Sequence, residues 1–197
     1  MQQALRVIKL GGSLLDWPAL REQFELWLAK QAPVHSIMIV GGGNLVGVFR
    51  RLCQRVPVDE TVAHWICIDL MSITARLASE ILGLPLTANY ENLTVGDQGI
   101  LVFDAAAWLR TRQIGPCSWD VTSDSIAAFV ATALRADELV LLKSTLPAAA
   151  NVLLEPGFVD NYFSTAIRNY RTAKSDRGAL VRFVNLRDTE FGEGKLA

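Results

Sequence analysis

Two apolar runs that each end in glycines constrain this chain most. Residues 5–10 lead into Gly11, Gly12 and Ser13, and residues 36–40 lead into Gly41, Gly42, Gly43 and Asn44. Each pattern predicts a buried strand that opens into a tight turn and then a helix. Glycine lets the backbone approach a ligand closely, and amides at a helix amino terminus can hold an anion. The presence of two such glycine turns indicates an anion site, although each turn alone is also compatible with a structural turn that binds nothing.

Apolar runs alternate with helical patterns along the rest of the chain. We expect strands at 84–88, 100–103, 138–143 and 180–186, and helices at 17–30, 45–56, 59–82, 105–112, 126–135 and 159–170. This alternation predicts a mostly parallel sheet that is covered on both faces. We expect strand 180–186 to be the last strand, residues 187–197 to be frayed, and Met71, Ile73 and Leu77 to belong to the core.

Composition excludes several classes of protein. The 197 residues are 51% hydrophobic and carry a net charge of −1, so no basic field favours nucleic acid or an anionic membrane. No leader pattern is visible, and no apolar run reaches the roughly 18 residues that a membrane span needs, so we expect a cytoplasmic protein. Three cysteines and two histidines in this spacing indicate reduced thiols and no protein metal site.

Three charged residues are placed where a ligand would bind. Lys9 lies inside the first strand, and Lys143 ends strand 138–143. Ligands of open α/β sheets bind beyond the carboxyl ends of the strands, so both lysines are predicted to face one crevice. Asp124 lies in the polar run 122–125 at the start of a helix, and this run holds more polar residues than capping alone requires.

These motifs, in this order, resemble the amino-acid kinase superfamily. The matching segments are residues 7–13, 39–44, 122–128 and 141–145, with a weaker match at 159–163. The resemblance implies an αβα sandwich that uses ATP and Mg²⁺, with an acceptor-side lobe at 1–103 and a nucleotide-side lobe at 104–197 in one domain. It implies that Lys9, Gly11, Gly12 and Ser13 hold the transferred phosphoryl group, that Gly42, Gly43 and Asn44 meet the acceptor, that Asp124 orients the lysines, and that Lys143 faces the nucleotide.

Two segments narrow the substrate that the resemblance implies. Residues 41–44 and 142–145 look most like the uridylate kinase branch, whose acceptor is a phosphate monoester. Residues 59–65 are similar to a short branch that phosphorylates aminomethyl-furan-methyl phosphate in methanofuran-type cofactor synthesis. By this resemblance His64 faces the acceptor phosphate, Arg50, Arg51 and Arg76 are candidate cations, and the protein is a homo-oligomer. His64 is equally compatible with a half-buried structural histidine.

The chain departs from the family pattern on the nucleotide side. The family places an acid and a glycine where this chain has residues 146–150, and Lys174 is the nearest candidate for a late phosphate-binding lysine. An ATP-dependent kinase acting on a phosphate monoester is the leading hypothesis. A non-catalytic relative that binds a phosphorylated metabolite or a partner protein is the alternative, and a carboxylate kinase that makes an acyl phosphate is a third.

Overall fold

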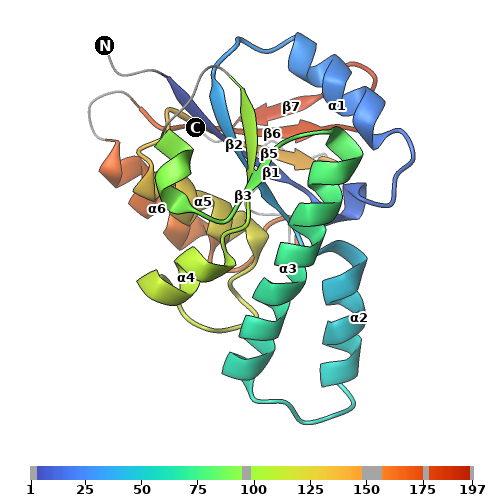
Figure 1. Ribbon diagram of the computed structural model, residues 1–197, viewed down its shortest axis with the longest axis vertical. Helices are drawn as coiled ribbons and strands as arrows, with labels where there is room; N and C mark the ends of the chain where they lie inside the picture. The colour runs from blue at the N-terminus through green and yellow to red at the C-terminus, as the bar shows by residue number, and fades with distance from the viewer. Residues whose placement is uncertain (1–3, 95–98, 148–156, 175–177, 196–197) are drawn as a thin grey trace.

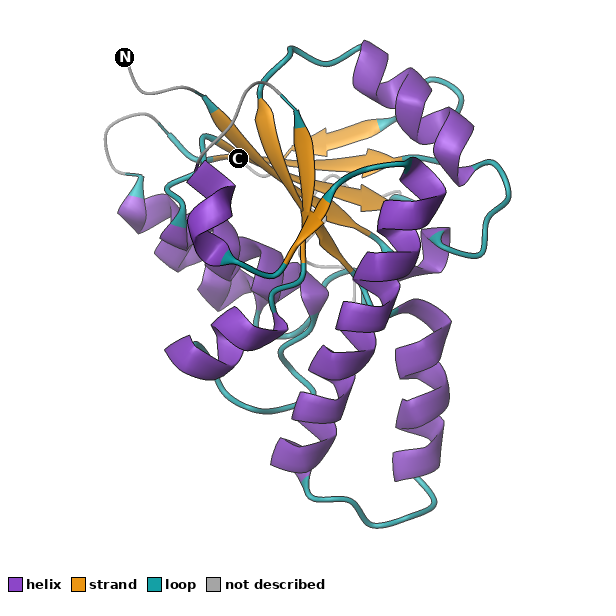
Figure 2. Cartoon of the chain, viewed as in Figure 1, coloured by secondary structure: helices purple, strands orange, loops and turns teal. Residues whose placement is uncertain are grey.

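The computed structural model describes residues 4–94, 99–147, 157–174 and 178–195. A seven-stranded sheet with the order β3-β4-β2-β1-β5-β6-β7 forms its centre (Figures 1 and 2). The strands are β1 (Leu5–Leu10), β2 (His35–Val40), β3 (Leu86–Thr87), β4 (Ile100–Phe103), β5 (Glu138–Lys143), β6 (Leu180–Asn185) and β7 (Glu193–Lys195). All neighbouring strands are parallel except β6 and β7. The expected α/β class and mostly parallel sheet are therefore confirmed.

Helices cover both faces of the sheet, because successive strand residues point to opposite sides. The helices are α1 (Leu20–Ala29), α2 (Gly43–Cys53), α3 (Glu60–Leu82), α4 (Ala106–Arg112), α5 (Ser123–Ala133) and α6 (Phe163–Ala173), with short 3-10 turns at Gly12–Leu14 and Tyr90–Thr94. Val7 and Leu141 pack with residues of α4, α5 and α6, whereas Ile8 and Leu142 pack with α1 and part of α3. Within the described residues, none of the helices combines the length and hydropathy that crossing a bilayer requires.

Helix α3 is capped at both ends by residues of its own sequence. The Asp59 carboxylate accepts a hydrogen bond from the amide of Val62 at 3.1 Å, and Gly83 ends the helix with a φ of 66°. The half of α3 near Asp59 extends beyond the sheet beside α2 (Figure 1). The expectation that Ile73 and Leu77 belong to the core is wrong, because their side chains are 52% and 45% exposed on the outer face of α3.

The carboxyl-terminal segment corrects another expectation. Strand β6 is not the last strand, and the expected fraying of 187–197 is wrong for Glu193–Lys195, because β7 pairs antiparallel with β6 at Val184, Phe183 and Arg182. The Arg182 guanidinium lies 2.6 Å from the Glu193 carboxylate and 2.5 Å from that of Glu138. This charge network joins β7 to the sheet and explains how so short a strand holds its place.

Several helix boundaries differ from their predicted positions. Helix α1 begins at Leu20 instead of residue 17, α5 begins at Ser123 instead of 126, and α6 begins at Phe163 instead of 159. Strands β1 and β5 have the predicted ends, and β2, β1 and β5 are adjacent in the sheet. Both glycine turns and Lys143 therefore lie at the same edge.

Candidate active site

The two glycine turns contact each other through their main chains. A Cβ atom on Gly12 would lie 2.1 Å from the Gly43 nitrogen, and one on Gly43 would lie 2.5 Å from the Gly12 carbonyl oxygen. Gly43 also has a φ of 56°, which a side chain would resist. These glycines are therefore required by close approach, and no other residue type fits without moving the turns apart.

Free backbone amides gather at this contact. The Gly11 amide donates to the Leu142 carbonyl at 2.9 Å, so it is part of the sheet and is not available to a ligand. By contrast, the amides of Gly12, Ser13, Gly43 and Asn44 donate to no acceptor in the part of the chain that the structure describes. Such amides at the starts of a 3-10 turn and of α2 can bind oxyanions.

Lys9, Asp124 and Lys143 form a buried cluster beside these amides. The Lys9 Nζ lies 2.9 Å from Asp124 Oδ1, and the Lys143 Nζ lies 2.9 Å from Asp124 Oδ2. The structure thus brings together the three residues that the sequence singled out from three separate motifs. Two ammonium groups share one carboxylate in direct contact, and the charge of Asp160 also acts on Lys143 from farther away.

The two lysines differ in the donors that they have left. Lys143 donates to both oxygens of Asp124 and to the Phe158 carbonyl at 2.7 Å, which uses all three of its N–H groups. Lys9 has Asp124 as its sole polar partner among the described residues. Lys9 therefore has ammonium N–H groups that remain available to a ligand.

Burial and charge shift the pKa values of this cluster. Burial alone would raise the pKa of Asp124, but the Lys9 and Lys143 charges outweigh it and hold that pKa below its usual range. Burial lowers the pKa of Lys143 to about 8, and the Lys9 charge adds to this effect while Asp124 opposes it. Asp124 is thus ionised at neutral pH, and Lys143 loses its proton at a lower pH than an ordinary lysine does.

Asp160 belongs to the site, although its sequence context, the weakly matching segment 159–163, did not single it out. Its carboxylate accepts hydrogen bonds from the amides of Thr122 and Ser125, at 3.0 and 2.9 Å, and from both of their hydroxyls. It therefore caps α5 from a distant segment and fixes the turn that presents Asp124. Residues 122–125 hold more hydroxyl groups than helix capping needs, and this excess indicates that an acceptor from another segment binds them.

A cavity of about 420 Å³ lies on the β5 side of the cluster. Lys9, Gly12, Ser13 and Lys143 line one part of it, and Leu146, Pro147, Gly157 and Phe158 line another. The Ser13 and Ser144 hydroxyls are hydrogen-bonded to each other at 3.1 Å across its wall. Of the divergent loop 146–150, residues 148–150 lie outside the described part of the chain.

A second cavity, of about 50 Å³, lies on the α2 side of the cluster. Its lining includes Gly42, Ser123, His64, Arg50 and Trp119, and no aspartate or glutamate. The Arg50 guanidinium lies 5.0 Å from the centre of the Trp119 ring and has no carboxylate partner in the described chain. This cavity therefore suits an anion at its Arg50 end.

His64 forms a wall that the small cavity shares with a larger one. Its Nδ1 lies 3.2 Å from the Ser118 carbonyl oxygen, and burial lowers its pKa, so the ring is mostly neutral at neutral pH. Beyond it lies a cavity of about 420 Å³ that is lined by uncharged residues, among them Thr61, Trp65, Ile114 and Phe129. The two cavities thus adjoin at His64, Val121 and Ile126.

Four further residues lie in places that the sequence did not indicate. The Asn44 side chain donates to Asp16 at 2.7 Å, so it ties the two glycine turns together. Lys174 pairs with Asp137, which precedes β5 at the opposite edge of the sheet, so Lys174 is not a phosphate ligand of this site. Neither Arg51 nor Arg76 lines any of the cavities described here.

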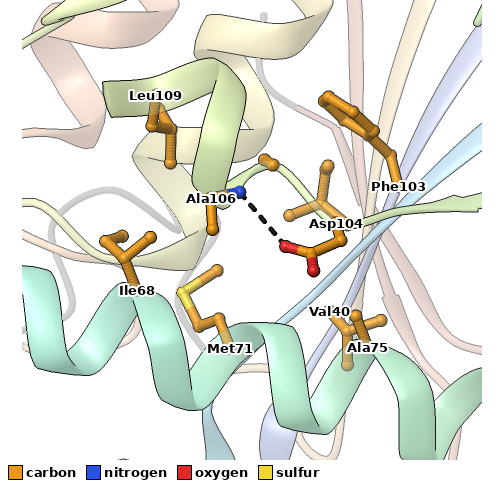
Figure 3. A pocket seen from close by; sticks show the side chains of 10 residues that line it. Val40, Ile68, Met71, Ala75, Phe103, Asp104, Ala106 and Leu109 are labelled. Carbon is orange, nitrogen blue, oxygen red and sulfur yellow. Dashed lines mark hydrogen bonds between the residues drawn. The ribbon is translucent and has the colours of Figure 1, made fainter. Parts of the chain in front are cut away.

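A cavity of about 10 Å³ lies between α3 and α4 (Figure 3). The Asp104 carboxylate borders it and accepts hydrogen bonds from the Ala106 amide at 3.2 Å and from the Ser72 hydroxyl at 2.7 Å. Apolar side chains including Ile68, Met71 and Leu109 surround the rest. The volume matches about one water molecule, so this cavity is a packing feature that joins the two helices.

The fold defines an α/β protein with a mostly parallel sheet, and comparison with known proteins gives the family. Residues 4–145 match the model of the amino acid kinase family, and the chain belongs to that family. A curated relative is the [5-(aminomethyl)furan-3-yl]methyl phosphate kinase of Methanocaldococcus jannaschii, 23% identical over 140 residues. The match spans 70% of this chain and 64% of that relative.

Solved structures show the same fold at low sequence identity. The uridylate kinase of Archaeoglobus fulgidus aligns with a TM-score of 0.59 at 15% identity, over 89% of this chain and 99% of that chain. The aspartate kinase of Synechocystis aligns with a TM-score of 0.63 at 14% identity, over 98% of this chain and 40% of that chain. The resemblance identified from the sequence motifs is confirmed at the level of family and fold.

Proposed function

We propose that this protein is an ATP-dependent kinase that phosphorylates a small phosphate monoester. The observation that carries the proposal is the buried cluster of Lys9, Asp124 and Lys143 at the contact between two glycine turns with free amides. Phosphoryl transfer needs in-line positioning and neutralisation of charge, and this arrangement offers both without a covalent nucleophile. Membership of the amino acid kinase family supports the assignment.

The residues that line the cavity on the β5 side of the cluster fit a nucleoside triphosphate. The 420 Å³ cavity has the size of a small-ligand site, and its lining combines lysines, free amides and apolar residues. Its described lining holds no carboxylate, so Mg²⁺ would be held through the nucleotide's phosphates. When bound, MgATP supplies the phosphoryl group and part of the charge neutralisation.

The chain's own residues have distinct tasks in this proposal. Lys9 directs its spare donors at the transferred phosphoryl group, together with the amides of Gly12 and Ser13. Lys143 faces the nucleotide, and Asp124 holds both lysines in place without acting as a base. The amides of Gly43 and Asn44, with Gly42, face the acceptor. The proposed acceptor-side lobe at 1–103 and nucleotide-side lobe at 104–197 each contribute to both sites, because Lys9 and Ser13 line the nucleotide cavity and Trp119 and Ser123 line the acceptor cavity.

The acceptor is proposed to bind in the small cavity and to extend past His64 into the larger one. Arg50 brings a positive charge to the small cavity, whose described lining holds no aspartate or glutamate, and this favours an acceptor that is already an anion. The uncharged lining beyond His64 suits a compact ring. The acceptor named for the curated relative, an aminomethylfuran-methyl phosphate, has this form and would place the protein in methanofuran-type cofactor synthesis.

The test is a phosphoryl-transfer assay with MgATP and three acceptors. We expect ADP formation with [5-(aminomethyl)furan-3-yl]methyl phosphate, and less with UMP or aspartate. Calorimetric titration with MgATP runs in parallel. A protein that binds phosphorylated acceptors but not MgATP would instead be the non-catalytic binder, and transfer to aspartate alone would indicate a carboxylate kinase.

We expect MgATP affinity to fall as the pH rises through about 8. Burial lowers the pKa of Lys143 from 10.5 to about 8, so its positive charge is lost there. In the unfolded chain Lys143 keeps its proton up to about pH 10.5. Between about pH 8 and 10.5 the unfolded state therefore binds one more proton than the folded state, and the free energy of unfolding rises with pH. Calorimetry from pH 6.5 to 9.5 measures the fall in affinity. Lys143→Arg serves as the control and should flatten the profile, whereas an unchanged profile would contradict the assignment.

Arg50→Ala should weaken acceptor binding and leave turnover largely intact. A hydrogen bond to a charged group contributes about 1.5–3 kcal/mol, which corresponds to a rise in the acceptor KM of roughly 10- to 100-fold. The kcat should change less than about threefold, because the contact is made before and during transfer. Arg51→Ala is the matched control, because Arg51 is the next residue along α2, is exposed and lines neither cavity. Equal effects of both variants would contradict the role of Arg50.

We also propose that the protein self-associates through the outer faces of α2 and α3. Helix α2 contains no buried residue, and Leu45, Val48 and Leu52 are 42%, 56% and 52% exposed along it. Sedimentation velocity should show an oligomer that dissociates on Val48→Glu with Leu52→Glu. A monomeric wild-type protein at micromolar concentration would overturn this proposal.

A further inference from the structure

Arg187 lies beyond the end of β6, next to the proposed phosphate site. The Arg187 amide donates to Asn185 Oδ1 at 3.1 Å, and the neighbouring Leu186 amide donates to the Lys143 carbonyl at 2.9 Å. The backbone that carries Arg187 is therefore fixed to the end of β5. Its side chain is free to reach across to the first glycine turn.

The guanidinium of Arg187 makes two contacts with that turn. It donates to the Ser13 carbonyl oxygen at 3.2 Å, and its central carbon lies 5.4 Å from the centre of the Trp17 ring. No acidic side chain pairs with it in the part of the chain that the structure describes. The contacts are thus made to the loop and its aromatic neighbour, and not to a competing carboxylate.

The Ser13 carbonyl is linked to the free amides through a hydrogen bond inside the turn. It belongs to the peptide that carries the Leu14 amide, and this amide donates to the Gly11 carbonyl at 2.9 Å. The Gly11 carbonyl lies in the same peptide as the Gly12 amide, so a contact that fixes the Ser13 carbonyl also holds the peptide that presents this amide. Asn44 holds the same loop at a second residue, Asp16, at 2.7 Å.

We propose that Arg187 is a positioning residue that clamps residues 11–17 so that the amides of Gly12 and Ser13 face the terminal phosphate of the nucleotide. The idea rests on the proposed kinase function. Arg187 acts through the Ser13 carbonyl and the Trp17 ring and does not itself touch substrate. The terminal phosphate is the group that these amides meet, so the effect of Arg187 is specific to ATP over ADP.

The test compares Arg187→Ala, Arg187→Lys and Arg21→Ala with the wild-type protein. Arg21 is an equally accessible arginine on α1 whose exposed ion pair with Glu25 lies outside the site, so its variant is the control. We expect Arg187→Ala to raise the Kd of MgATP at least tenfold and that of MgADP less than threefold. Arg187→Lys should recover part of the difference, and added guanidinium should partly rescue Arg187→Ala.

Hydrogen exchange of the unliganded protein gives a second, independent reading. Arg187→Ala should speed amide exchange in residues 12–17 several-fold and leave α5 unchanged. Unchanged exchange there, or equal losses for MgATP and MgADP, would overturn the clamp. If the wild-type protein binds neither nucleotide, the proposed function fails, and the exchange result still decides whether Arg187 holds the loop.

Discussion

Lys9→Met is expected to lower the rate of phosphoryl transfer by roughly 10²- to 10³-fold, because a preorganised charge aimed at developing negative charge typically contributes this much. Lys9 has donors left over, whereas Lys143 uses all of its own. Methionine nearly fills the same volume and leaves the Asp124 and Lys143 pair neutral overall. Stability should therefore change little.

The measurement is single-turnover ADP formation with the acceptor found in the assay, together with thermal unfolding. Lys30→Met serves as the control, because Lys30 follows α1 and lies over the Phe191 ring, away from the site. A Lys9→Met protein that keeps its turnover while folded would remove the kinase assignment.

Asp124→Asn is expected to affect both stability and activity. The side chain is 7% exposed and is the shared partner of two ammonium groups, so its replacement leaves those charges close together without a counter-charge in contact with them. Removing one partner of a buried ion pair costs about 3–5 kcal/mol. Urea denaturation at pH 7 measures this loss, and we expect a clearly lower midpoint.

The double variant Asp124→Asn with Lys143→Met separates the two effects. It removes one positive charge together with the negative one, so most of the lost stability should return. Transfer should stay impaired, because Lys9 no longer has the carboxylate that orients it. If the double variant is no more stable than Asp124→Asn, the shared-counterion explanation is wrong.

The central strands and the charged cluster could be predicted because their signals are local. Strand β1 is apolar apart from Arg6 and Lys9, and β5 is apolar between Glu138 and Lys143, so both lysines stand out near the ends of their strands. Asp124 was found because it lies in a polar run at a helix start. Its contact with both lysines then follows from parallel strands that end at one edge of the sheet.

The features that escaped prediction depend on contacts between distant segments. Asp160 reaches Ser125 across 35 positions, and Arg187 reaches Ser13 across 174. Strand β7 has three residues, too few for an alternating pattern, and it depends on the pairing of Glu193 with Arg182. Ile73 and Leu77 were assigned to the core because apolar residues favour burial, but both are 45% or more exposed on a face of α3 that the described residues do not cover.

The contact between Gly12 and Gly43 has a consequence for how such a site can diversify. The spacing of the two phosphate-facing turns is set by main chain against main chain. In the proposed kinase, the gap that the phosphoryl group crosses is therefore independent of the side chains around the acceptor. Substitutions at positions such as Arg50 or Trp119 can then exchange one acceptor for another while the transfer distance stays constant.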